Sequence, residues 1–208
     1  IFCPSAVAHL VGARLPGIFE QYGLAMAAGK SMVYGGNLQG DEAGGLVRAH
    51  DGLVCLGAPV SLNTDFVVQH VQQSLEAEVN PMPALRHLKP WTALSLLRFS
   101  INQRPGYLAR VVQRVPEVCA LFNLFDDSVD NALLGIMRLV NASRDNSTIA
   151  TALQLRSLPL QLGGLGLARH GGVAGVAANM QSREVLVRHM QEHYADLLPQ
   201  ADVDWGGV

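Results

Sequence analysis

The chain has 208 residues, of which 49% are hydrophobic, so it is long enough to bury a substantial core. Charged residues make up 15%, against about 25% in typical soluble domains, and the formal net charge is −2. This balance argues against strong sequence-independent binding of nucleic acid, which needs clustered Lys and Arg. It favours a surface that is buried against partner proteins. The alternative explanation of the low charge is a compositional bias of the genome, since 13 of the 15 basic residues are Arg.

The first 62 residues show one helical pattern followed by short β-type runs. Apolar residues at helical spacing predict a helix over residues 6–22, with a kink at Pro16 and Gly23 as its C-cap. Residues 30–34 and 52–60 are typical of short strands, and the glycine-rich segment between them is typical of a loop. Together they predict one helix packed with a small antiparallel sheet of two or three strands.

From residue 64 onward the apolar spacing becomes helical and stays so. The expected helices cover residues 64–79, 91–103, 107–115, 118–140, 147–155 and 173–198. The predicted fold class is therefore α+β, with a partial α/β segment at 1–62, a helical domain at 63–170, and a C-terminal helix and tail at 171–208. No apolar run reaches the length of a membrane span.

Three cysteines, Cys3, Cys55 and Cys119, are widely separated and have no CxxC spacing. This pattern indicates neither a zinc site nor a redox pair. Cys55 and Cys119 lie in apolar runs, so we expect them in the core. Free cysteines and the lack of a recognisable signal peptide predict an intracellular, reducing compartment, without indicating which organelle.

Several short segments, taken in order, resemble one protein family. They are Gly23-Leu24 with Lys30-Ser31, Cys55-Leu56-Gly57-Ala58-Pro59, Leu96-Leu97-Arg98 with Arg104 to Arg110, and Arg156-Ser157-Leu158-Pro159-Leu160 through Leu165-Gly166-Leu167. In this order they are similar to the distal palm and thumb of reverse transcriptases of non-LTR retrotransposons. The resemblance covers roughly residues 1–170 by direct inspection of the motifs.

The resemblance implies roles for six residues in binding nucleic acid. Lys30 would be the palm lysine that assists the leaving pyrophosphate, and Leu56 and Gly57 would lie in the hairpin that grips the primer. The remaining three candidates are thumb arginines: Arg98, Arg104 and Arg110.

The catalytic aspartates of that family have no counterpart in this chain and would precede Ile1. Phe125-Asp126-Asp127 superficially resembles the catalytic motif, but it lies within a long helical run. We interpret it as a solvated helix face. Two-metal phosphoryl transfer needs paired carboxylates, so we expect no catalytic residues, no metal and no cofactor.

Three further patterns have both a functional and a structural interpretation. Gly163 to Gly166 could cradle a phosphate, but glycines interleaved with leucines favour a tight apolar turn. His189 and His193 are spaced as metal ligands on a helix, but a polar helix face explains them better. Trp91 and Tyr107 could stack on bases, although their helical context favours core or interface packing.

The favoured function is a non-catalytic, retroelement-derived structural or interaction subunit of a larger assembly. The alternative is the C-terminal palm and thumb part of a reverse transcriptase that clamps a primer–template duplex. An unrelated small enzyme has no motif in its favour. Other protein subunits are the expected partners, and the expected docking elements are an edge strand at 30–34 or 52–56 and the helix at 173–198. Net charge disfavours nucleic acid as a partner.

Overall fold

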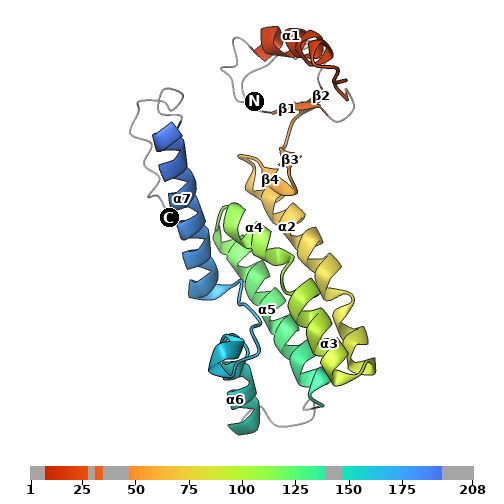
Figure 1. The fold of residues 1–208 in the computed structure, drawn as a ribbon, viewed down its shortest axis with the longest axis vertical. Helices are drawn as coiled ribbons and strands as arrows, with labels where there is room; N and C mark the ends of the chain where they lie inside the picture. The colour runs from red at the N-terminus through yellow and green to blue at the C-terminus, as the bar shows by residue number, and fades with distance from the viewer. Residues whose placement is uncertain (1–7, 28–30, 35–46, 139–146, 194–208) are drawn as a thin grey trace. The chain divides into compact units, whose positions relative to one another are not determined.

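The computed structural model describes residues 8–27, 31–34, 47–138 and 147–193 (Figure 1). The chain divides into two compact units, Ile1–Val71 and Gln72–Val208. The described part is mostly helical with two small sheets, which confirms the predicted α+β class. The division between the units falls inside a helix. The domain limits expected from the sequence, near residues 63 and 171, stay a prediction.

The first unit begins with helix α1 (Ala8–Gln21), which contains Pro16 as expected. The backbone reverses after α1 at Gly23, whose φ of +69° explains why glycine stands there. Strand β1 (Met32–Tyr34) follows, and it pairs with β2 (Val47–Ala49).

The second sheet of this unit is a hairpin of β3 (Leu53–Cys55) and β4 (Ala58–Val60). This pair is antiparallel as predicted, and β3 also contacts β1. The pairing of β1 with β2 is parallel, however, and the sequence analysis missed β2. A three-residue strand is too short to show a period-2 pattern, and a parallel partner far along the chain leaves no turn signal.

Side chains fix the segment that leads from the hairpin into helix α2 (Thr64–Val79). The Tyr34 hydroxyl accepts a hydrogen bond from the Leu62 backbone N–H at 2.7 Å. Asn63 caps α2, because its Oδ1 accepts a hydrogen bond from the Asp65 N–H at 3.0 Å.

The second unit contains the end of α2 and a series of helices. They are η4 (Met82–His87), α3 (Pro90–Leu96), the π-helical turn η5 (Leu97–Ile101), α4 (Pro105–Val111), α5 (Pro116–Ile136), α6 (Ser147–Leu155), η6 (Leu160–Leu162) and α7 (Gly172–His193). Proline opens α3, α4 and α5, where its missing N–H costs no hydrogen bond. Pro116 therefore begins a helix rather than only ending the preceding one.

Helix α5 organises the core of this unit. Both η4 and α3 pack on α5, and α7 packs mainly on α4. The apolar stripe of α5 is buried and consists of Val118, Phe122, Phe125, Val129, Leu133 and Ile136. The Asn179 side-chain amide on α7 donates hydrogen bonds to the backbone oxygens of Arg110 and Val112, so α7 satisfies carbonyls at the end of α4. In the described part of the chain, no helix combines the length and apolarity that crossing a membrane requires.

Candidate functional site

The residues that the resemblance assigned to the primer grip lie in the β3–β4 turn. Leu56 and Gly57 both have positive φ angles, +51° and +83°, which builds a two-residue hairpin turn. Leu56 is 90% exposed at the tip. The Gly57 carbonyl oxygen lies 3.2 Å from His70 Nε2, which holds the turn against α2. Lys30, the remaining palm candidate, lies outside the described residues.

The three thumb arginines each interact with a different part of the chain. The Arg98 guanidinium lies 4.5 Å from the centre of the Phe99 ring and packs against Gly166. Arg104 forms an ion pair with Glu78, with Nη1 and Oε1 3.1 Å apart. Arg110 donates from Nε to the Gly106 carbonyl oxygen within its own helix. Each guanidinium thus contacts a different neighbour.

Asp126 is buried, and the interpretation of Phe125-Asp126-Asp127 as a solvated helix face is wrong for this residue. Asp126 is 4% exposed and pairs with the fully buried Arg156, Oδ1 to Nη2, at 2.8 Å. Its carboxylate also accepts the backbone N–H groups of His170 and Gly171. Asp127 is exposed as expected.

Arg156 is the centre of this buried network. Its Nη1 donates to Asp130 Oδ1 at 2.7 Å, and Arg169 contacts the other oxygen of Asp130 at 3.3 Å. The network therefore joins α5 to residues on both sides of the glycine-rich segment at 163–166. Sequence analysis missed it, although one signal was present: Asp126 falls on the apolar stripe of α5, and Asp130 follows one turn later.

His170 extends the network toward η5. Its ring Nε2 lies 2.7 Å from the Asn102 carbonyl oxygen, so this nitrogen carries the proton and donates. Burial lowers the pKa of His170 below its ordinary value, outweighing the hydrogen bond to Asn102 and the charge of Asp126, which raise it. The ring is therefore neutral at pH 7.

Arg114 is a second buried cation in the same core. Its Nη2 donates to the carbonyl oxygens of Ala109 and His170, and its guanidinium lies 4.3 Å from the centre of the Phe122 ring. Burial lowers the pKa of Arg114. Arg114 thus braces the core and is not part of a basic surface.

The glycine-rich segment is a tight apolar turn, as the structural interpretation predicted. Gly163 and Gly166 adopt φ angles of +77° and +63°. A Cβ on Gly164 would overlap the backbone of Leu158. The five consecutive N–H groups of residues 163–167 all donate to backbone carbonyls of residues 155–160. None is left to bind a phosphate.

The remaining sequence candidates have different outcomes. His189 is exposed on α7, and no group of three or more potential metal ligands occurs in the residues that the structure describes. Cys119 is partly buried. Cys55 is exposed, so its expected core position is wrong, because it ends β3 beside the hairpin turn. Tyr107 is partly exposed.

Large apolar side chains are exposed along α3 and η5. Trp91 is 82% exposed and Phe99 is 66% exposed. They are eight residues apart, which places them within about a quarter turn of each other around this helical segment. Leu88 and Leu96 are also exposed here. The four residues Leu88, Trp91, Leu96 and Phe99 are called the α3 patch below.

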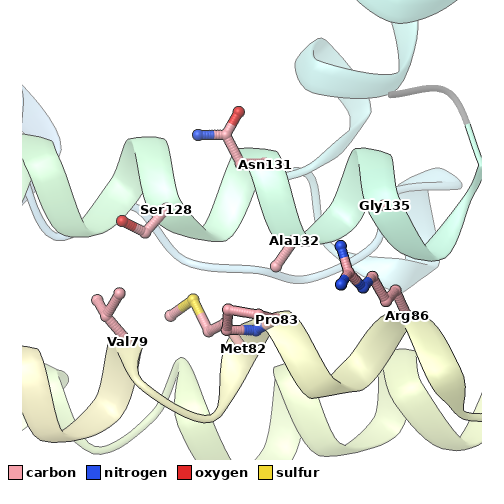
Figure 2. Close-up of a pocket in the computed structure, with 8 residues that line it drawn as sticks. All are labelled: Val79, Met82, Pro83, Arg86, Ser128, Asn131, Ala132 and Gly135. Carbon is pink, nitrogen blue, oxygen red and sulfur yellow. The ribbon is translucent and has the colours of Figure 1, made fainter. Parts of the chain in front are cut away.

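A groove of about 300 Å³ lies between η4 and α5 (Figure 2). It is called the α5 groove, and it is lined by Val79, Met82, Pro83, Arg86, Ser128, Asn131, Ala132 and Gly135. Figure 2 shows Val79 and Ser128 at one end and Arg86 beneath Gly135 at the other. Arg86 is the charged residue of this lining.

Comparisons with protein-family models, with curated proteins and with solved structures find no match for this chain.

Proposed function

We propose that this chain is a non-catalytic, retroelement-derived interaction subunit of a larger protein assembly. The observation that carries the proposal is a contrast within the helical unit. Several of its arginines are buried or paired with acidic side chains, while the large apolar side chains of the α3 patch are exposed. A protein surface of this kind fits another protein better than it fits a phosphate backbone.

The engagement of the arginines supports the first half of this contrast. Arg114 and Arg156 are buried, and three others form ion pairs with acidic side chains: Arg104, Arg169 and Arg188. Duplex binding depends on the number of phosphates that Lys and Arg neutralise. Cations already paired with carboxylates contribute little to that number. This disfavours the alternative, a thumb that clamps a primer–template duplex.

The α3 patch supports the second half. Trp is among the residues most enriched at the energetic centres of protein interfaces. An exposed apolar cluster of this kind marks an interaction surface more often than a free one. Burying Trp91 and Phe99 under a partner would remove most of the apolar surface of this patch from water.

The state of Asp126 supports the absence of catalysis. Its carboxylate is engaged by Arg156 and two backbone N–H groups. A carboxylate held in this way cannot also coordinate a magnesium ion. We therefore expect no primer extension by this chain with magnesium or manganese.

Purification from cells of the source organism tests the proposal. The tagged chain should elute in gel filtration as part of a stoichiometric protein complex. The double variant Trp91→Ser/Phe99→Ser should lose that complex, while Leu10→Ser, which changes an exposed apolar residue of α1, should keep it. A wild-type chain that elutes alone as a stable monomer would contradict the proposal.

Binding to an RNA–DNA duplex separates the two functions. Fluorescence anisotropy over a series of salt concentrations should give weak binding with a shallow salt dependence. Tight binding that falls steeply with salt, and that Arg98→Gln or Arg110→Gln weakens, would favour the duplex clamp instead.

A further inference from the structure

We propose that the α5 groove binds a partner segment in which a large apolar side chain is adjacent to an acidic residue. This inference rests on the proposed function, because it names the chemistry of the partner. It concerns a different surface from the α3 patch.

The shape of the groove comes from small side chains on α5. Ser128, Ala132 and Gly135 follow one another at helical spacing, so they form one stripe along the helix. Opposite them, Val79, Met82 and Pro83 provide an apolar wall. Ligand pockets for drug-sized molecules begin at about 300 Å³. A groove of this volume is suited to one large side chain and a short stretch of its backbone.

The positive charge of Arg86 favours a partner segment in which an acidic residue is adjacent to the apolar side chain. Arg86 is exposed, and its Nε donates to His87 Nε2 at 3.1 Å. No ion pair to Arg86 occurs in the described part of the chain. Its Nη atoms can therefore form charge-assisted hydrogen bonds with an incoming carboxylate.

The positions of these groups define the direction of the bound segment. Figure 2 places Arg86 at the Gly135 end, while Val79 and Met82 extend toward Ser128. The apolar side chain would lie against Val79 and Met82, and the carboxylate would lie at the Gly135 end.

Methyl NMR of the 208-residue chain tests this proposal directly. The methionine methyl groups are labelled with ¹³C, and the signal of Met82 is assigned from the variant Met82→Leu. The probe is the peptide acetyl-Ala-Leu-Glu-Ala-amide, and its control is the same peptide with Gln in place of Glu. The Met82 signal should shift saturably with the Glu peptide, at millimolar concentrations.

Two variants test the contributions of the Arg86 charge and of the groove shape separately. The Gln peptide should bind about threefold to fivefold more weakly than the Glu peptide, the range expected for a partly exposed ion pair. Arg86→Gln should remove this difference, while Arg14→Gln, the same change on an exposed residue of α1, should keep it. Ala132→Leu fills the groove and should abolish the shift. Should Ala132→Leu not fold, Arg86→Gln with the two peptides still decides.

Three results would overturn the proposal: an unmoved Met82 signal, equal affinity for the two peptides, or a preference for Glu that survives Arg86→Gln. These failures are distinct from failure of the proposed function. If the peptide does not bind but the α3-patch variant still loses its native complex, the interaction subunit stands and only the groove assignment fails.

Discussion

Two faces of helix α5 have opposite characters. One face is closed by large apolar side chains and by the Asp126–Arg156 ion pair. The other carries the small residues of the α5 groove, where η4 packs on α5 but leaves a space of about 300 Å³. The same helix thus holds the core together on one side and leaves space for an apolar occupant on the other.

This difference shows where the few charges of the chain are used. A buried charge must be paired and hydrogen-bonded. The Asp126 carboxylate and the two Nη atoms of Arg156 have partners in each other, in Asp130 and in backbone groups from the segment at 168–171, while Arg156 Nε has none among the described residues. The charges therefore determine how the glycine-rich turn and α7 join α5. The outer surface keeps its apolar patches, which is consistent with a subunit of an assembly.

Removing Arg156 should have the largest effect on stability. The variant Arg156→Met leaves Asp126 and Asp130 without their main partner in a buried site, which costs about 3–5 kcal/mol for a broken buried pair. Urea denaturation followed by circular dichroism measures the loss. Arg188→Met is the control, because its ion pair with Glu184 is exposed, and it should cost less than about 0.5 kcal/mol. Equal effects for the two variants would show that the network does not close the core.

Substitutions in the glycine-rich turn should have the next largest effect. A Cβ at Gly164 meets the Leu158 backbone, so Gly164→Ala should cost about 1–3 kcal/mol through overpacking. Gly163 has open space around it and only a positive φ, so Gly163→Ala should cost about 1 kcal/mol. The same denaturation assay checks the order, and a reversed order would contradict this account of the turn.

Acid should lower the stability of the folded chain through the buried His170. The pKa of His170 is lower in the folded chain than in the unfolded chain, where it lies near 6.5. Between those two values the unfolded state binds more protons, so stability rises with pH and is lost as pH falls below about 6.5. Urea midpoints at pH 7.5 and 5.5 measure the loss. His170→Gln should reduce this dependence, and an unchanged dependence would assign it to other groups.

Of these variants, Arg86→Gln in the α5 groove should have the smallest effect on folding. Arg86 is exposed and forms no ion pair among the described residues, so Arg86→Gln should change stability by no more than about 0.5 kcal/mol. Thermal unfolding of the wild type and the variant checks this. A loss of 2 kcal/mol or more, at the scale of a core substitution, would show that the groove face also supports the fold.

Much of the secondary structure could be predicted from the chain itself. The expected helix at 64–79 coincides with α2, and the expected helix at 147–155 coincides with α6. The expected helix at 118–140 corresponds to α5, which begins at Pro116 and ends at Ile136. These elements have apolar residues at helical spacing, and such a signal is local.

The candidate sites were less predictable for a physical reason. Asp126, Arg156 and His170 are far apart in the sequence and meet only when α5 and the segment before α7 pack together. The α5 groove likewise needs η4 to lie against small residues of α5. Burial and pairing of a charge depend on such long-range contacts, which no local pattern contains.

By itself, the sequence determined the α+β class, the helices at 64–79 and 147–155, and the tight apolar turn at 163–166, because backbone geometry and apolar spacing act over a few residues. Only the tertiary structure decided that Asp126 is buried, that the arginines at 98, 104 and 110 have separate partners, and that Trp91 is exposed. Those properties depend on which surfaces meet, since burial is a property of the packed chain and not of its neighbours in sequence.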